Sequence, residues 1–199
     1  MITSIKIIII GDSGVGKSCL LYSYLNNKPC QYPISSIGLD CQSNKIKIGD
    51  HEIKLVFWDT VGQESFLSIT KSYYRNSQIA ILVYSVDDLQ SFTNLTKWID
   101  VINQYNTEPV QKVIVGNKID SPKKRQVNKK EAEEFAQNND MLYFELTQND
   151  PALVRDSITK IVKSYIDNIE EHYLLGTPPE NNSEVLKISK LDSYGECCF

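Results

Sequence analysis

Gly11-Asp12-Ser13-Gly14-Val15-Gly16-Lys17-Ser18 fits the pattern G-x-x-x-x-G-K-[ST], which is typical of phosphate-binding loops. The β-branched apolar run at residues 5–10 predicts a buried strand before the loop. Residues 19–25 follow it with apolar side chains at helical spacing and with neither glycine nor proline. A strand, a glycine loop and a helix start in this order form a nest of backbone N–H groups aimed at phosphate. A chance match in a glycine-containing turn is the alternative, and it leaves both flanks unexplained.

The chemistry of the loop follows from its residue types. Its glycines lack a Cβ, so the backbone can wrap closely around an anion. Lys17 is predicted to reach the β- and γ-phosphates of a nucleotide, and the Ser18 hydroxyl is predicted to ligate Mg²⁺. The predicted phosphate-binding residues are Gly11, Asp12, Ser13, Gly14, Val15, Gly16, Lys17, Ser18, Cys19 and, further along the chain, Gly62.

Composition limits the class of protein. The chain has 199 residues, which suits one domain with a tail, and its net charge of −4 argues against a nucleic-acid binder. The start of the chain leads directly into the first predicted strand and shows no signal peptide. Its 5 cysteines are odd in number and lack framework spacing, so we expect a reducing compartment.

Strand and helix patterns alternate along the chain, which predicts an α/β fold with a doubly wound sheet and helices on both faces. The sheet is predicted to be six-stranded and mostly parallel, with one antiparallel strand joined through a hairpin at Gly49-Asp50. The predicted strands are residues 5–10, 44–48, 53–58, 79–86, 113–115 and 141–146, and the later helices are 91–105, 128–138 and 151–169. Residues 1–174 form the predicted domain, and 175–199 have the composition of a disordered tail.

Two further motifs fall at predicted strand ends, where ligands bind in such sheets. Asp59 precedes Gly62-Gln63, so the carboxylate can orient the Mg²⁺ shell, Gly62 can donate to the γ-phosphate, and Gln63 can orient an attacking water. A turn capped by an aspartate is the simpler interpretation of this segment. Its place after a phosphate loop favours the functional one.

Asn117-Lys118-Ile119-Asp120 predicts selection of guanine. The Asp120 carboxylate can accept from the two neighbouring N–H groups of guanine, which adenine lacks, and the Lys118 stem can flank the base. Asp120 therefore argues against an ATPase or a nucleotide kinase built on the same loop.

With these motifs assembled, the chain resembles the Ras superfamily of small GTPases, and within it a divergent Rab. The resemblance implies the P-loop G-domain fold and a GTP/GDP switch that regulates vesicle-mediated membrane trafficking and hydrolyses GTP slowly unless an activating protein assists. It rests on residues 11–18, 35–40, 54–60, 72–75 and 116–120. The competing interpretation is a nucleotide-locked binding module with little turnover.

The resemblance also assigns residues and shows departures. It implies Ser36 as a Mg²⁺ ligand where the family has threonine, and it implies that Thr147 and Gln148 contact guanine in a degenerate Ser-Ala-Lys motif that ends in Asn149. Val61 is bulkier than the family's residue before the Gly-Gln pair. Pro29 and Cys41 each stand where an aromatic residue is usual.

The expected partners follow from the same resemblance. None of the 3 arginines, Arg75, Arg125 and Arg155, lies between Ser18 and Ser36, so we expect an activating protein to supply one in trans. An exchange factor, a GDP-dissociation inhibitor, prenylation escort machinery and effectors are also implied, for a monomer that binds no nucleic acid.

The chain ends in Glu196-Cys197-Cys198-Phe199, which is not a C-a-a-X signal. Paired terminal cysteines resemble the double geranylgeranylation sites of Rab proteins, and stable membrane binding takes two signals. We therefore expect lipidation of Cys197 and Cys198 and attachment to the cytoplasmic face of intracellular membranes, with cycling through the cytosol. Two thiols on a frayed end are the alternative.

Overall fold

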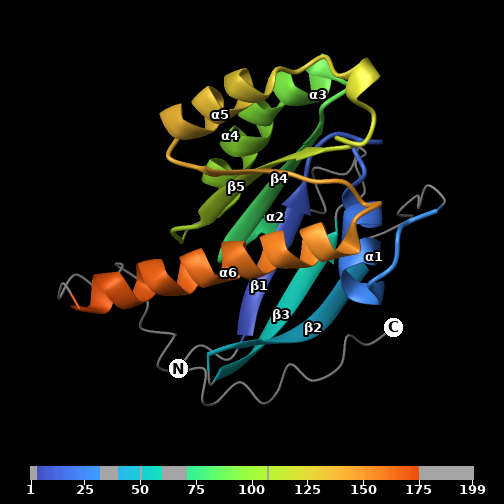
Figure 1. Cartoon of the computed structure of the whole chain (residues 1–199). Coiled ribbons are helices and arrows are strands. Elements are labelled where there is room, and N and C mark those ends of the chain that lie inside the picture. The colour runs from blue at the N-terminus through green and yellow to red at the C-terminus, as the bar shows by residue number, and fades with distance from the viewer. Residues whose placement is uncertain (1–3, 32–39, 50, 60–70, 107, 175–199) are drawn as a thin grey trace.

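The computed structural model describes residues 4–31, 40–49, 51–59, 71–106 and 108–174 (Figure 1). Six strands form one sheet in the order β2-β3-β1-β4-β5-β6. The strands are β1 (Ser4–Ile10), β2 (Asp40–Ile48), β3 (His51–Asp59), β4 (Ile79–Ser85), β5 (Gln111–Asn117) and β6 (Leu142–Glu145). The helices are α1 (Lys17–Asn26), α2 (Lys71–Tyr74), α3 (Leu89–Thr93), α4 (Leu95–Tyr105), the 3₁₀ helix η2 (Pro122–Lys124), α5 (Lys129–Asn138) and α6 (Pro151–Leu174).

Strand direction confirms the predicted fold class. β1 lies between β3 and β4 and pairs with both in parallel, and β4, β5 and β6 continue the parallel series. β2 pairs antiparallel with β3, and Gly49 turns the hairpin with a φ of 60°. The carboxyl ends of β1, β3, β4 and β5 therefore meet at one edge of the sheet, which places the site there.

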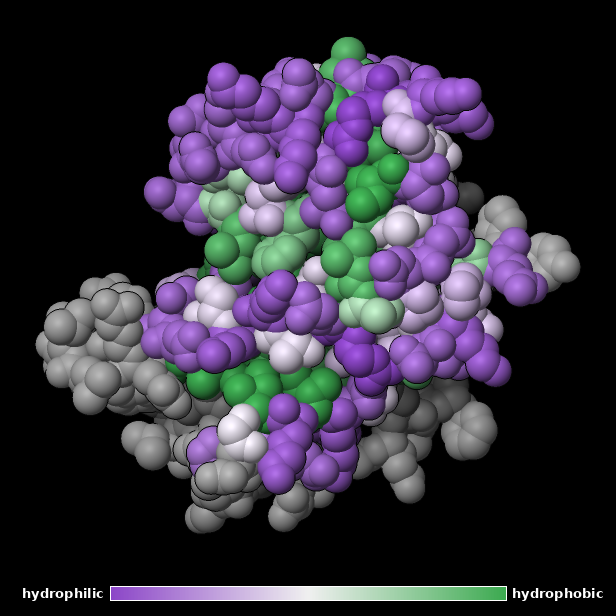
Figure 2. Space-filling view, in the orientation of Figure 1, coloured by the Kyte–Doolittle hydropathy of each residue, from purple (hydrophilic) through white to green (hydrophobic). Residues whose placement is uncertain are grey.

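Helices cover both faces of the sheet (Figure 1). α1 and α6 pack with Ile7 and Ile9 of β1 on one face, whereas α2, α3, α4 and α5 pack with Ile8 and Ile10 on the other. Because both faces of β1 are buried, its sequence is nearly continuous isoleucine rather than alternating. Figure 2 shows hydrophilic side chains over α5 and α6, and an apolar strip between these helices.

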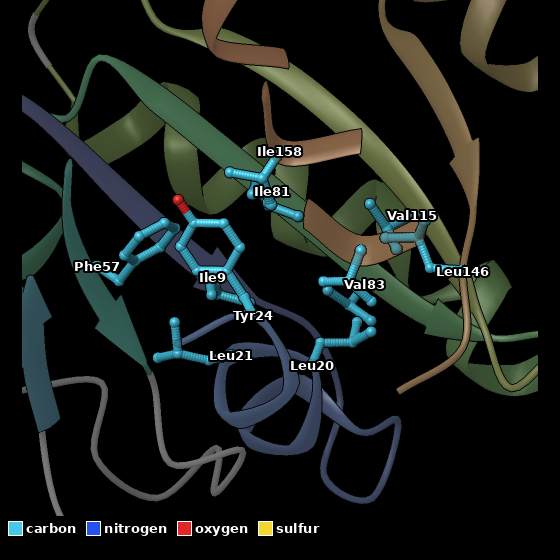
Figure 3. Close-up of a pocket in the computed structure, with 11 residues that line it drawn as sticks. Ile9, Leu20, Leu21, Tyr24, Phe57, Ile81, Val83, Val115, Leu146 and Ile158 are labelled. Carbon is cyan, nitrogen blue, oxygen red and sulfur yellow. The ribbon is translucent and has the colours of Figure 1, made fainter. Parts of the chain in front are cut away.

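A cavity of about 20 Å³ lies between α1, α6 and the sheet (Figure 3). Leu20, Leu21 and Tyr24 of α1 border it, with Val115 and Leu146 at the opposite side. This volume is about that of one water molecule, and apolar cavities of this kind stay dry. The cavity is a packing defect in the core, and it is far too small for a nucleotide.

The predicted boundaries differ from the structure most clearly in three places. The predicted helix 91–105 is two helices, since Asn94 ends α3 and begins α4, and its side chain turns to the phosphate loop. β2 begins at Asp40 instead of 44, because its first residues pair with β3 without an apolar alternation that would reveal a strand. α6 continues to Leu174. The predicted tail, 175–199, lies outside the described residues, so the division at 174 stays a prediction.

Within the part of the chain that the structure describes, we find no helix with the length and apolar character needed to cross a membrane.

Candidate nucleotide-binding site

The glycine loop leaves β1 after Ile10 and enters α1 at Lys17. Gly11, Gly14 and Gly16 have φ values of 140°, 79° and 98°, a region that L side chains rarely adopt. A Cβ on Gly11 would lie 2.1 Å from the Val83 carbonyl oxygen, and one on Gly16 would lie 2.4 Å from Asn117 Nδ2. The loop is thus pressed against β4 and β5, and two of its glycines are required for that approach.

Lys17 is held inside this loop. Lys17 is only 5% exposed. Its Nζ donates to the carbonyl oxygens of Gly11 at 2.8 Å and Asp12 at 2.7 Å. Burial lowers the Lys17 pKa to about 8, although the carboxylates of Asp59 and Asp12 favour the charged form. A bound phosphate would oppose the effect of burial, so the cation suits an anionic ligand.

The Asp12 side chain fixes the loop from outside. Asn94 Nδ2 donates to Asp12 Oδ2 at 2.6 Å, and Trp98 Nε1 donates to Oδ1 at 2.8 Å. Both residues lie in the predicted helix 91–105, and the sequence analysis singled out neither as a contact of the loop. In the sequence, Asn94 is a polar residue within a helical pattern. Such residues are too common to predict a contact with the loop.

Asp59 is the last residue of β3 and is 3% exposed. It pairs in register with Ile9, two residues before the loop begins at Gly11, and its charge acts on Lys17. Ser18 lies in the first turn of α1 at the same edge. Ser36, Val61, Gly62 and Gln63 lie outside the described residues, so their predicted roles stay predictions.

Asn117 connects the phosphate loop to the predicted guanine motif. It is the last residue of β5 and fully buried, and its Nδ2 donates to the Val15 carbonyl oxygen at 2.8 Å. Its buried Oδ1 accepts no hydrogen bond from the residues described. An unsatisfied buried acceptor is costly, which favours a ligand or water at this position.

Asp120 is held by the degenerate motif. Thr147 Oγ1 donates to Asp120 Oδ1 at 2.5 Å, and Asn149 Nδ2 donates to Oδ2 at 3.0 Å. An ionised carboxylate has about four acceptor sites, so two remain for a pair of donors on a base. Asn149, which the sequence marked only as a lost lysine, is therefore a direct support of Asp120.

The neighbours of Asp120 complete this side of the site. Lys118 has a φ of 67°, and its Nζ lies 3.9 Å from Asp87 Oδ1. The Gln148 side chain lies beside the loop, because its Oε1 would be 3.7 Å from a Cβ on Gly16. That oxygen is buried and has no hydrogen-bond partner in the described part of the chain.

Sequence analysis did not predict a polar network that lies next to Gly116 of β5. Arg125 forms two hydrogen bonds to Glu145, at 2.7 Å and 3.0 Å, and Tyr143 donates to the same carboxylate at 2.8 Å. The hydroxyls of Tyr143 and Tyr84 lie 3.0 Å apart, and a Cβ on Gly116 would lie 2.8 Å from the Tyr84 hydroxyl. Burial raises the pKa of Tyr84 to about 12 and also raises the pKa of Tyr143, so both phenols stay protonated. The network supports β5 directly before Asn117.

The structure therefore brings the loop, Asp59, Asn117 and Asp120 to one sheet edge. No group of three or more His, Cys, Asp and Glu side chains that could hold a metal occurs in the described ranges. The predicted Mg²⁺ ligands are hydroxyls and one carboxylate, so a cluster of that kind is not what they require. The buried Lys17 and Asp59 and the glycine cradle fit a magnesium-bound phosphate chain.

Comparison with known proteins gives a consistent result. The model of the Ras family matches residues 6–167. The chain is 36% identical over 197 residues to the Ras-related protein Rab-1D of Dictyostelium discoideum, covering 98% of this chain and 94% of that protein. It is 36% identical over 197 residues to the GTP-binding protein YPT1 of Saccharomyces cerevisiae, covering 97% and 96%. It is 40% identical over 168 residues to the Ras-related protein Rab-1 of Theileria parva, covering 84% and 76%.

Proposed function

The chain belongs to the Ras family and, within it, to the Rab-related small GTPases, and from this premise we propose which of its residues perform each step. It is a GTPase, a switch between GTP and GDP that acts in vesicle-mediated membrane trafficking. The interpretation as a nucleotide-locked binding module is not favoured by these relatives.

The phosphates are bound by residues 11–19, through backbone N–H groups and the Lys17 side chain, and by Gly62. Support comes from the left-handed glycines and from the burial of Lys17 among the loop carbonyls. Lys17 and the loop N–H groups neutralise charge on the β- and γ-phosphates, and the Asp12 contacts with Asn94 and Trp98 keep the loop in shape.

Guanine is selected by Asp120, with Asn117, Lys118, Thr147 and Gln148 around the base. The observation that carries this proposal is the hydrogen bond from Asn117 Nδ2 to the Val15 carbonyl oxygen, which joins residues 102 positions apart. It holds the guanine motif against the phosphate loop, so a single nucleotide can contact both. Adenine would leave Asp120 without its donors.

Mg²⁺ fits Ser18, Ser36 and Asp59, and when bound it supplies positive charge that polarises the phosphate oxygens. Gln63 orients the attacking water. Arg125 is occupied with Glu145, and Arg155 Nη2 donates to the Tyr24 carbonyl oxygen at 3.3 Å. These contacts support slow intrinsic hydrolysis with an arginine supplied by an activating protein.

Rab relatives work with regulators and effectors and act at membranes. For this chain we propose an exchange factor, an activating protein, a GDP-dissociation inhibitor and prenylation escort machinery as partners of a monomer. Lipidation of Cys197 and Cys198 on the tail would attach it to the cytoplasmic face of membranes.

Calorimetry on nucleotide-stripped protein tests the site. We expect Mg²⁺-dependent binding of GDP and no measurable binding of ADP at the same concentrations. Asp120→Asn should lose affinity for GDP by about 10²-fold or more and gain affinity for xanthosine diphosphate. Equal binding of GDP and ADP would contradict the assignment of Asp120.

Single-turnover GTP hydrolysis tests the catalytic role. Gln63→Leu should slow the reaction further if Gln63 orients water, whereas a locked module would show the same negligible rate with either residue. Hydrolysis as fast without an activating protein as with one would contradict the need for an arginine in trans.

A further inference from the structure

Two cysteine sulfurs meet beside the phosphate loop. Cys30 Sγ donates to Cys19 Sγ at 2.8 Å, and both residues are thiols in this structure. Cys19 lies in the first turn of α1, directly after Ser18, and is partly exposed. Cys30 is 8% exposed and follows the end of the same helix, where Asn27 adopts a left-handed conformation with a φ of 52°.

The separation of these sulfurs suits a covalent bond. A disulfide requires an S–S distance of about 2.05 Å, so the two atoms need to approach by less than about 1 Å. The residues are 11 positions apart, and α1 itself lies between them. The fold has thus already placed the two thiols together, and little further ordering is needed to join them.

We propose that Cys19 and Cys30 form an oxidative modification site, at which small-molecule disulfides of the glutathione class create a reversible internal disulfide that slows release of the bound nucleotide. The effect on release rests on the proposed function. Formation of the disulfide does not, because it depends only on the two thiols.

The reaction balances as two thiol–disulfide exchanges. The Cys19 thiolate, the more accessible of the two, attacks glutathione disulfide, and a Cys19–glutathione bond forms as one glutathione leaves. The Cys30 thiolate then attacks the Cys19 sulfur, and the second glutathione leaves. The protons of the two protein thiols end on the two released glutathiones. The protein is oxidised by two electrons, and one glutathione disulfide is reduced to two thiols.

Oxidation restricts the movement of residues 27–30, the segment after α1. The new bond ties Cys30 to the turn that carries Ser18, so residues 27–30 can no longer move away from the phosphate loop. Release of a tightly held ligand requires local opening of the elements around it. A cross-link between two of these elements should therefore slow release, and a reducing glutathione pool would restore it.

Cys41 provides a matched control within the same chain. It lies in β2, where it pairs in register with Trp58 across the antiparallel ladder. Cys41→Ser should leave formation of the Cys19–Cys30 bond unchanged, whereas Cys30→Ser should abolish it. Both substitutions replace a sulfur with an oxygen in a side chain of the same shape.

The experiment treats the full chain with excess glutathione disulfide and maps its chymotryptic peptides by mass spectrometry, with cleavage after Tyr22 and Leu39 separating Cys19, Cys30 and Cys41 from one another. We expect a cross-linked pair of peptides lighter by two hydrogens than its reduced components, and reversal by dithiothreitol. Glutathione adducts on both Cys19 and Cys30 without a cross-link, or unmodified thiols at high excess, would overturn the proposal.

Release of a fluorescent GDP analogue is then measured from the reduced and oxidised chain. We expect several-fold slower release after oxidation of the natural chain and of Cys41→Ser, and no change in Cys30→Ser. Equal release rates would overturn the effect on the nucleotide. A chain that forms the disulfide but never binds the analogue would instead refute the proposed function, so the two failures are distinguishable.

Discussion

The phosphate end of the site, residues 11–18 with Asp59, and the base end, residues 116–120 with 145–149, are built in different ways. At the phosphate end the closest approach is to backbone, since a Cβ on Gly11 would meet the Val83 carbonyl oxygen at 2.1 Å, and the Asn94 and Trp98 side chains hold Asp12 only from outside the loop. At the base end they involve side chains from distant segments, such as Asn149 on Asp120 and Arg125 on Glu145.

This difference explains which departures from the family pattern are tolerated. A backbone cradle depends on glycine at fixed positions, and the chain keeps all of them. A side-chain support can be replaced by another donor with suitable reach. Asn149 stands where the family has lysine, and its amide donates to Asp120 Oδ2.

The largest expected effect comes from adding one methyl group to the phosphate end. Gly11→Ala should lower the free energy of unfolding by on the order of 3 kcal/mol, because the new Cβ meets rigid backbone of β4 and the φ of 140° is strained. Urea denaturation measures this loss. GDP binding should disappear with it.

Gly49→Ala is the matched control, since Gly49 has a φ of 60° and a Cβ there meets nothing within 4 Å. It should cost about 1 kcal/mol through backbone strain alone. Equal losses for the two variants would mean that the close approach to β4 does not matter, and the contrast between the two ends would fail.

A smaller loss is expected from the support behind the base end. Arg125→Met removes both hydrogen bonds to Glu145, whose side chain is 14% exposed, and should cost about 2 kcal/mol in the free energy of unfolding. Thermal or urea unfolding provides the measurement.

Lys45→Met serves as the comparison for this ion pair. The Lys45–Glu52 pair has the same 2.7 Å separation, but its side chains are 67% and 64% exposed, so its loss should cost less than about 1 kcal/mol. If Lys45→Met and Arg125→Met lowered the free energy of unfolding equally, burial of the Arg125 pair would contribute nothing, and the network would not support β5.

The same contrast explains what could be predicted from sequence. The loop at 11–18 was predicted fully, because glycine spacing and the flanking strand and helix are local properties of the chain. The six strands followed from apolar runs, except for the start of β2, whose residues 40–43 carry no alternation. These parts depend on short-range patterns.

Contacts between distant side chains could not be predicted in this way. Asn94 and Trp98 reach Asp12 across more than 80 positions, and Tyr84 meets Tyr143 across 59. Nothing in one sequence identifies such partners, because each residue type is common in cores and helix ends. The helix break at Asn94 was missed for the same reason, since its cause lies in the phosphate loop.

The smallest expected effect probes the replacement at Asn149. Asn149→Ala removes the 3.0 Å hydrogen bond to Asp120 Oδ2 and leaves the one from Thr147, so the carboxylate keeps one of its two supports. A single exposed hydrogen bond contributes about 1 kcal/mol, so affinity for GDP should fall about fivefold with unchanged stability.

Asn139→Ala is the control for this variant. Asn139 is likewise an exposed asparagine with one amide hydrogen bond, but it donates to the Phe135 carbonyl oxygen, away from the site. GDP affinity in that variant should equal that of the natural chain. If Asn149→Ala also binds GDP as the natural chain does, Thr147 alone positions Asp120, and the base end then tolerates loss of the family's lysine without any substitute.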